Sequence, residues 1–221
     1  MATEANANRL AKDIKDDALR KGPEVVALAG LTPGMVVADV FGGGGYYSEI
    51  ISQFVGKSGK VYLHNNRAYL PYVDKELTQR LANDRLPNVV RYDKEVDDLM
   101  FDQHSLDAVF YVLGYHDIYF KAEGWNIDKD LLLRQLSQAI KQDGILVVVD
   151  HNAPKDTGFE TSQKLHRIEK NYVVKELEKY GFRLDSASDL LENPKDTLTL
   201  SALAPEMRRK TSRFILIFKK V

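Results

Sequence analysis

The sequence predicts an α/β protein whose central sheet is mostly parallel. Stretches typical of strands alternate with stretches typical of helices along most of the chain, which is the pattern of repeated βαβ units. Three strand-like runs are almost continuously apolar rather than alternating, as central strands buried on both faces are. These runs are VVADV (36–40), DAVFYVL (107–113) and ILVVV (145–149). We therefore expect helices on both faces of the sheet.

The chain begins with a helical segment that we expect to cover one edge of the domain. Residues 9–29 pass from charged to apolar, with a break at Gly22-Pro23 and an end near Gly30, so residues 1–30 form this N-terminal cover. The alternating elements follow. We predict strands at 35–40, 60–64, 88–92, 106–113 and 145–150, and helices at 46–54, 72–83 and 129–142.

The C-terminal part predicts one more helix and two strands. A helix over 162–180 ends at Gly181 and places four apolar side chains on one stripe, namely Leu165, Ile168, Tyr172 and Leu177. The segments GFRLDSAS (181–188) and RFILIFKK (213–220) read as strands. The polar, Pro-containing stretch 187–212 between them is too long for a hairpin, so it is an excursion and a candidate lid. We expect one domain over 1–221.

Composition excludes several classes of function. The 221 residues carry a formal net charge of −1 and 44% hydrophobic residues, so the overall charge does not favour nucleic acid or an acidic membrane surface. The absence of cysteine removes disulfides and thiolate chemistry. The charged first 22 residues resemble neither a signal peptide nor a membrane span. We expect a cytoplasmic protein, with a leader removed before Met1 as the alternative, and both monomer and homodimer stay open.

A glycine turn carries most of the functional information. The first buried strand closes on Asp39, and four glycines (42–45) then lead into a helix, an arrangement that presents backbone N–H groups to a nucleotide-like ligand. The dinucleotide fingerprint G-x-G-x-x-G fits poorly, because its third position falls on Ser48 or Tyr47. The phosphate-binding P-loop is excluded, because no Gly-Lys-Ser/Thr follows the turn.

The segment VVADVFGGGGYYSE (36–49) resembles the first motif of class I S-adenosylmethionine-dependent methyltransferases. Asp39 takes the place of the acid that ends the strand, and Phe41, Gly43 and Gly45 take the three glycine positions, with Phe41 departing from the pattern. The GGGGYY turn is most similar to an uncharacterised subgroup of predicted bacterial methyltransferases. The similarity includes YHD (115–117), VVDH (148–151) and LHRI (165–168). It implies a Rossmann-like, seven-stranded sheet with an antiparallel last strand, and S-adenosylmethionine as the methyl donor.

The resemblance also implies residues that bind the donor. Its amine needs an anion and its carboxylate needs N–H donors, which Asp39 and the turn supply. Asn65 stands where a ribose-binding acid is usual, and Glu95 with Val96 aligns with the segment that meets adenine. The alternative for Asn65 is a polar cap at the end of a strand. The alternatives for Glu95 and Val96 are a solvated acidic loop or a register slipped to Asp97 or Asp98. The predicted binding set is Asp39, Phe41, Gly42, Gly43, Gly45, Tyr46, Asn65, Glu95 and Val96.

The carboxyl ends of two later strands bring histidines and carboxylates to the edge where ligands bind in parallel sheets. We predict His116 and His151 as general bases, with Asp117 or Asp150 orienting them and His166 lining the pocket. The alternative is that these residues only end strands and cap turns. A metal site from His116, Asp117, His151 and His166 is a further alternative without tight ligand spacing, and we assign no metal.

Together these features predict methyl transfer from S-adenosylmethionine to a small-molecule acceptor, in a pocket formed by the loops after the fourth and fifth strands. Two other functions stay open. One is a non-catalytic protein that binds S-adenosylmethionine or a nucleoside, which the departures at Phe41 and Asn65 favour. The other is a nicotinamide-dependent oxidoreductase.

Overall fold

A seven-stranded sheet in the order β3-β2-β1-β4-β5-β7-β6 forms the centre of the computed structural model, which describes residues 9–221. β7 is antiparallel to both of its neighbours, β5 and β6, and the other pairs are parallel. The predicted mostly parallel sheet with an antiparallel last strand is therefore confirmed. The strands are β1 (Val36–Val40), β2 (Lys60–Asn65), β3 (Val89–Asp93), β4 (Leu106–Val112), β5 (Ile140–His151), β6 (Phe182–Ser188) and β7 (Arg213–Lys220).

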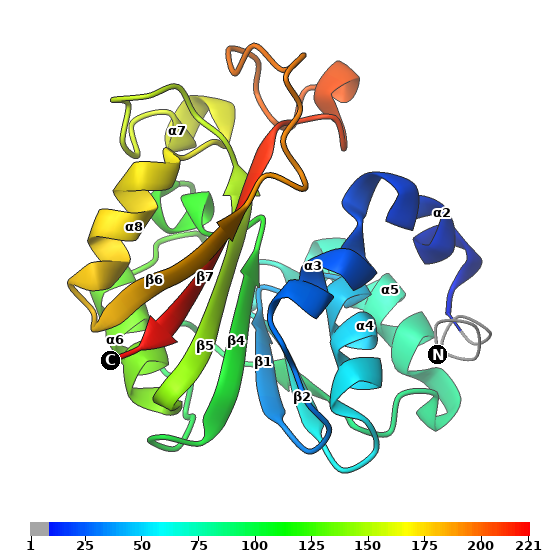
Figure 1. Ribbon diagram of the computed structural model, residues 1–221. Coiled ribbons are helices and arrows are strands. Elements are labelled where there is room, and N and C mark those ends of the chain that lie inside the picture. The colour runs from blue at the N-terminus through cyan, green and yellow to red at the C-terminus, as the bar shows by residue number, and fades with distance from the viewer. Residues whose placement is uncertain (1–8) are drawn as a thin grey trace.

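Helices cover both faces of this sheet (Figure 1). On one face, α3 and α4 pack with α5 against a core that includes Val26, Ile51 and Leu77. On the other, α6 and α8 pack over a second core that includes Leu133 and Val173. The helices are α2 (Ala11–Arg20), α3 (Gly22–Leu28), α4 (Tyr46–Val55), α5 (Leu70–Leu81), α6 (Lys129–Ala139), α7 (Ser162–Leu165) and α8 (Lys170–Glu178), with 3-10 turns η1 (Ala82–Asp84), η2 (His116–Tyr119) and η3 (Pro205–Met207).

The single helix predicted over 162–180 is wrong. His166 adopts a left-handed backbone (φ 51°), which ends α7, and α8 starts only at Lys170. Between them Ile168 forms a bridge to Asn152, with its N–H donating to the His151 carbonyl and its carbonyl accepting from Ala153. Pairing with the end of β5 therefore replaces the helical hydrogen bonds at this point, and it brings the loop of His166 to the end of the sheet.

Two other boundaries differ from the predicted ones. The helix expected over 129–142 ends at Ala139, because Ile140 already pairs with Leu106 and extends β5. The N-terminal helix breaks at Lys21 (φ 46°), one residue before the predicted Gly22-Pro23. Residues 1–8 of the predicted N-terminal cover lie outside the described residues.

The excursion between β6 and β7 lies beyond the carboxyl ends of the parallel strands, at the top of Figure 1. Arg167 holds it there, since its guanidinium pairs with both oxygens of Asp196 at 2.9 and 3.1 Å and also donates to the Leu200 carbonyl. Both side chains of the ion pair are buried. The predicted candidate lid is thus anchored to the loop that follows α7.

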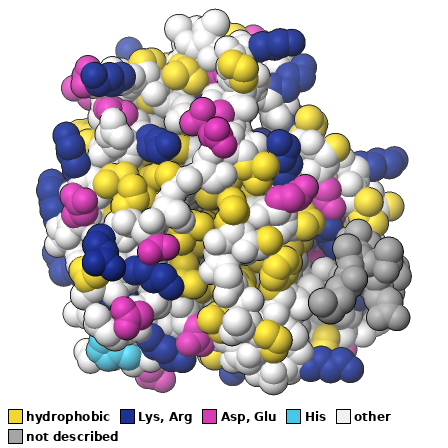
Figure 2. All heavy atoms as spheres, in the orientation of Figure 1, with side chains coloured by type: hydrophobic (Ala, Val, Ile, Leu, Met, Phe, Trp, Pro, Cys, Tyr) yellow, Lys and Arg dark blue, Asp and Glu magenta, His cyan; other side chains and the backbone are white. Residues whose placement is uncertain are grey.

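The surface seen in Figure 2 intersperses basic and acidic side chains around its margin and gathers hydrophobic ones near the centre. Among the described residues, no helix combines the length and apolar character needed to cross a membrane.

Candidate functional site

The glycine turn joins β1 to α4 and is held by main-chain and side-chain hydrogen bonds. Gly42 donates its N–H to the His64 carbonyl (2.9 Å), and Gly43 exchanges two 3.0 Å hydrogen bonds with the side-chain amide of Asn65. A Cβ added at Gly43 would meet nothing closer than Val73 Cγ1 at 4.0 Å. The turn is therefore open on the side of Gly43.

Side chains of the protein itself lie against the next two glycines. A Cβ at Gly44 would lie 2.2 Å from the Glu76 carboxyl carbon, and one at Gly45 would lie 2.6 Å from Leu63 Cδ1. Arg80, which is fully buried, donates to the Gly44 carbonyl and forms ion pairs with three acidic side chains, those of Asp13, Glu49 and Glu76. No local sequence pattern marks Arg80, although its side chain supports the turn from α5.

The side chains of Asp39 and Tyr46 are buried and hydrogen-bonded within the protein. The Asp39 carboxylate is 1% exposed and accepts a 2.6 Å hydrogen bond from Ser48 Oγ. Burial raises its pKa to about 6, and the Ser48 hydrogen bond opposes that rise. Tyr46 donates its hydroxyl to Asp17 (2.5 Å), and Arg20 lies 3.7 Å over its ring.

Phe41, the departure from the glycine pattern, packs among aromatic side chains at the carboxyl edge of the sheet. Its backbone is left-handed (φ 53°), and its ring is 4% exposed. The ring lies 5.3–5.7 Å from four other aromatic rings, those of His64, Tyr69, Tyr111 and Trp125. The Tyr111 hydroxyl is buried without a hydrogen-bond partner in the described chain, so this edge holds a polar atom that a ligand could satisfy.

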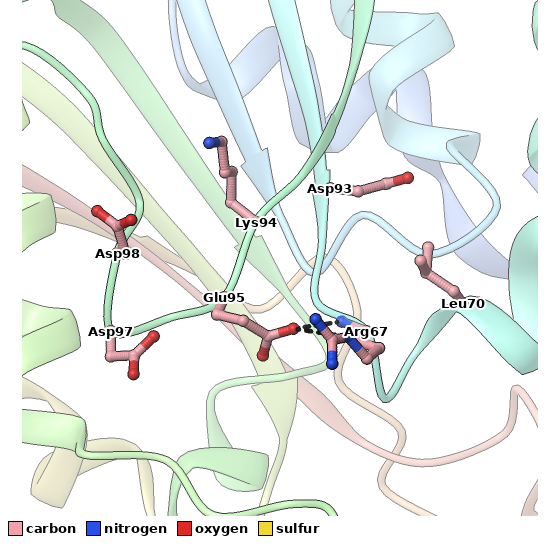
Figure 3. Close-up of a pocket in the computed structure, with 7 residues that line it drawn as sticks. All are labelled: Arg67, Leu70, Asp93, Lys94, Glu95, Asp97 and Asp98. Atoms are coloured by element: carbon pink, nitrogen blue, oxygen red, sulfur yellow. Dashed lines mark hydrogen bonds and ion pairs between the residues drawn. The ribbon is translucent and has the colours of Figure 1, made fainter.

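An acidic cavity of about 470 Å³ lies at the ends of β2 and β3 (Figure 3). In it Glu95 faces Arg67, accepting its backbone N–H at 3.1 Å, and the Glu95 side chain is 48% exposed. Its lining is Arg67, Leu70, Asp93, Lys94, Glu95, Asp97 and Asp98. Val96, by contrast, is buried and its carbonyl accepts from Gln135, while Asn65 is fully buried against the turn.

A second hollow, the histidine cavity, lies at the ends of β4 and β5 and measures about 600 Å³. It brings His116 and Asp117 of η2 together with His151 and His166, and its remaining lining is largely apolar and aromatic. Trp125 contributes one wall and donates Nε1–H to the Asp117 carbonyl (2.8 Å). The catalytic residues expected from two separate strand ends therefore share one cavity.

His116 is held between two carboxylates. Its Nδ1 lies 2.8 Å from Asp150 Oδ1 and its Nε2 lies 3.1 Å from Asp117 Oδ1. Burial by itself would lower the His116 pKa, but the two carboxylates outweigh it and raise the pKa to about 10. Burial by itself would raise the Asp117 pKa, but hydrogen bonds from His116 and His166 hold it below its ordinary value.

His151 has a different environment. Its Nδ1 lies 2.7 Å from Thr211 Oγ1, a residue of the excursion, and its ring centroid is 5.8 Å from that of His116. Burial lowers its pKa to about 3, so the ring is neutral at pH 7.

One short segment separates the two cavities. Arg67 and Leu70 line the acidic cavity, whereas Ala68 and Tyr69 line the histidine cavity. The Tyr69 ring packs on Phe41 and Trp125, and its hydroxyl donates to Asp117 Oδ2 at 3.3 Å. Tyr69 was not predicted as a site residue, because its sequence context shows only a loop before a helix.

Three side chains of the histidine cavity have the chemistry to hold a metal ion. In the described part of the chain, ligand atoms of His116, Asp117 and His166 all lie within 4.8 Å of one another. Two nitrogen ligands and one carboxylate suit zinc or ferrous iron. His151, which the sequence placed in the same alternative, is not part of this group.

Comparisons with known proteins place this geometry in context. No protein-family model matches the chain. It is 28% identical over 126 residues to the ubiquinone/menaquinone biosynthesis C-methyltransferase UbiE of Hahella chejuensis, covering 57% of this chain and 47% of that protein. It is 26% identical over 168 residues to the corresponding protein of Shewanella oneidensis, covering 76% and 60%. The chain thus spans about half to three fifths of the length of these curated relatives.

Solved structures match over nearly the whole chain. A SAM-dependent methyltransferase from Aquifex aeolicus superposes with a TM-score of 0.66 at 23% identity, covering 96% of this chain and 98% of that one. The [4+2]-cyclase SpnF superposes with a TM-score of 0.61 at 14% identity, covering 92% and 80%. The strand order, the antiparallel β7 and these superpositions agree, and the chain therefore has the Rossmann-like fold of class I S-adenosylmethionine-dependent methyltransferases.

Proposed function

We propose that this protein transfers the methyl group of S-adenosylmethionine to a small-molecule acceptor. The observation that carries the proposal is the arrangement of two cavities at the carboxyl edge, an acidic one beside β2 and β3 and a histidine-lined one beside β4 and β5, with residues of the segment 67–70 in both linings. A reaction between two bound substrates needs such adjoining sites. The similarity to curated methyltransferases supports the same conclusion.

The residues at the carboxyl edge of the sheet fit S-adenosylmethionine as the methyl donor. Glu95 is exposed enough to accept hydrogen bonds from a nucleoside, with the backbone of Val96 next to it, and the open side of Gly43 admits close approach. The Phe41 ring packs against Tyr69 and Trp125, which line the histidine cavity, so aromatic faces that suit a sulfonium gather on this side of the turn. S-adenosylmethionine supplies an electrophilic methyl group there. Asp39, Gly42, Gly45, Tyr46 and Asn65 act by shaping the turn.

On the acceptor side, we assign the proton-accepting role to His151. Both ring nitrogens of His116 are engaged by carboxylates, so His116 positions Asp117, and the Asp117 carboxylate accepts a hydrogen bond from the acceptor. His151 has one nitrogen on Thr211 and lines the cavity. Because burial lowers the pKa of His151 and makes it a weak base, an acceptor whose hydroxyl ionises readily, such as a phenol or an enol, suits this cavity best.

A non-catalytic role in binding S-adenosylmethionine or a nucleoside is the second candidate, and two observations favour it. The Phe41 ring occupies the centre of the edge, and the Asn65 amide is engaged by Gly43 rather than turned to a ligand. A nicotinamide-dependent oxidoreductase has less support, because Ser48 and Tyr47 still stand at the third fingerprint position.

Calorimetry and an acceptor screen test these alternatives. Methyl transfer requires binding of S-adenosylmethionine and S-adenosylhomocysteine in preference to NAD and NADP, together with turnover of a phenolic or enolic acceptor. His151→Ala should lower kcat by about 10²–10⁴-fold and leave donor binding unchanged, as loss of a proton acceptor does. Donor binding without turnover of any acceptor supports the second candidate, and preference for NAD refutes both.

We further assign the chain to the subgroup of predicted bacterial methyltransferases with a GGGYY turn, on the basis of residues 42–47. We infer a single domain, because the two cores lie on opposite faces of one sheet. A cytoplasmic monomer or homodimer without nucleic-acid or membrane partners agrees with the balanced charge of the chain.

A further inference from the structure

A third hollow, the arginine cavity, adjoins the histidine cavity and measures about 380 Å³. Four arginines from separate parts of the chain line it: Arg20 at the end of α2, Arg208 and Arg209 in the excursion, and Arg213 at the start of β7. Of the residues that the structure describes, no aspartate or glutamate is part of its lining. The cavity therefore concentrates positive charge in a protein whose net charge is −1.

Arg213 is almost fully buried, and no acidic side chain in the described part of the chain pairs with it. It is 5% exposed, and its Nη2 donates to the Leu19 carbonyl at 2.8 Å, but its Nε has no hydrogen-bond partner among the described residues. Among residues 9–221 no carboxylate forms an ion pair with it. Burial lowers its pKa, and the neighbouring charge of Arg20 lowers it further. A buried, unpaired guanidinium is costly, and an anion in the cavity would remove that cost.

The other arginines leave most of the positive charge uncompensated. Arg20 stacks over the Tyr46 ring. Neither Arg20 nor the exposed Arg208 forms an ion pair with any described residue. Arg209 pairs with Asp16 of α2. Among the described residues, only one of the four guanidinium groups therefore has an ion-pair partner. Guanidinium is the group that best recognises carboxylate and phosphate oxygens.

The arginine cavity adjoins the proposed acceptor site and shares part of its lining. His151, Leu113 and Leu203 line both cavities, and the Thr211 hydroxyl that holds His151 faces the arginine side. A molecule whose reacting group lies beside His151 therefore has room to extend a second group among the arginines.

We propose that the arginine cavity binds an anionic group, a carboxylate or a phosphate, of the methyl acceptor. The identity of the ligand as an acceptor rests on the proposed methyltransferase function, whereas the anion site itself rests only on the arginines. The acceptor class is then a small acid with a phenolic or enolic group at one end and an anionic group at the other.

The test measures binding of 4-hydroxybenzoate, 4-hydroxybenzamide and inorganic phosphate to the full chain. Trp125, the one tryptophan of the sequence, lines the histidine cavity and reports occupancy by its fluorescence. We expect 4-hydroxybenzoate to bind at least 10-fold more tightly than the uncharged amide, and phosphate to compete with it. Arg213→Met and Arg20→Met should each weaken 4-hydroxybenzoate binding at least 10-fold. Arg183→Ala, which removes an exposed arginine of β6, should leave it unchanged.

Folding of the variants is read separately from binding. Arg213→Met removes an unpaired buried charge, so its melting temperature should not fall, whereas a purely structural role of Arg213 predicts a clear decrease. Equal affinity of the wild type for the acid and the amide, or unchanged 4-hydroxybenzoate binding in both arginine variants, would overturn the proposal.

The donor's own carboxylate is the other source of such an anion. S-adenosylmethionine and 5′-methylthioadenosine, which lacks the amino-acid part, distinguish the two. If the arginine variants weaken only S-adenosylmethionine, the cavity serves the donor and the acceptor assignment is wrong. If arginine-dependent binding of 4-hydroxybenzoate persists in a protein that binds no S-adenosylmethionine, the proposed function fails while the anion site stands.

Discussion

The side-chain amide of Asn65 and the backbone of Gly43 exchange two hydrogen bonds, each 3.0 Å long. Asn65 is fully buried at the end of β2, so its carboxamide fixes the glycine turn from the neighbouring strand. An aspartate at this place could accept from the Gly43 N–H but could not donate to the Gly43 carbonyl. The amide in place of the usual acid is thus explained by its partner in the turn.

Asn65→Asp should therefore destabilise the protein by about 1–3 kcal/mol, because it leaves the Gly43 carbonyl facing a buried carboxylate. Urea unfolding at pH 7 measures the change. Asn83→Asp is the matched control, since Asn83 is exposed and its left-handed backbone suits both residues. Unchanged stability together with tighter S-adenosylmethionine binding would indicate instead that residue 65 faces the ligand.

Phe41→Gly tests whether the aromatic ring restricts access to the turn. Removing a buried ring costs about 3–5 kcal/mol, from which relief of the left-handed backbone returns roughly 1 kcal/mol. We expect a net loss of about 2–4 kcal/mol in unfolding free energy, together with tighter S-adenosylmethionine binding in calorimetry. Phe159→Ala, at an exposed ring, serves as the control. Weaker donor binding in Phe41→Gly would mean that the ring contacts the donor.

The central strands could be predicted from sequence because burial on both faces leaves a nearly continuous apolar run that needs no knowledge of partners. The same local signal failed over 162–180. Apolar spacing there suits a helix, but pairing of Ile168 with the end of β5 satisfies its backbone differently. That pairing depends on the folded sheet, so no local pattern could reveal it.

In the candidate site, too, the sequence predicts the position of residues along the sheet but not their long-range contacts. The histidines could be placed at one edge, because parallel strands end together. The environment that distinguishes His116 from His151 could not be predicted, since it depends on Asp150 in one case and on Thr211, sixty residues away, in the other. Arg80 likewise supports the turn through partners as distant as Asp13. Long-range polar contacts of this kind leave no periodic trace in the sequence.

Asp39 should make the stability of the protein fall between pH 4 and pH 6. Its pKa rises from 3.8 to about 6 on folding, so the unfolded chain ionises first as pH increases, and above pH 6 the folded state carries a buried carboxylate. Asp39→Asn keeps an acceptor for Ser48 and removes the charge. Its unfolding free energy relative to wild type should increase by about 2–3 kcal/mol from pH 4 to pH 7, measured by urea unfolding. If the difference in unfolding free energy between Asp39→Asn and wild type does not vary with pH, folding does not raise the pKa of Asp39.

Cobalt binding tests the metal alternative in the histidine cavity. His116 Nε2 and His166 Nδ1 lie 3.1 and 3.5 Å from Asp117 Oδ1, and two ligands each about 2.0–2.1 Å from one zinc-sized ion lie roughly 3–3.5 Å apart. Asp150 on the other His116 nitrogen is the kind of partner that metal-binding histidines have. If the site binds metal, Co²⁺ should give visible absorption with the wild type and with His104→Ala, whose histidine is exposed.

The same titration should show no such absorption with His166→Ala or Asp117→Asn, and about 10–100-fold weaker binding with Asp150→Asn. Circular dichroism of each variant confirms that the fold is retained. Because metal binding requires deprotonated ligands, Co²⁺ must also displace the proton that His116 holds between its two carboxylates, so binding should release protons into a weakly buffered solution. Absence of absorption in the wild type, or equal absorption in all four variants, would leave His116 as a hydrogen-bonded imidazolium that holds Asp117 in position.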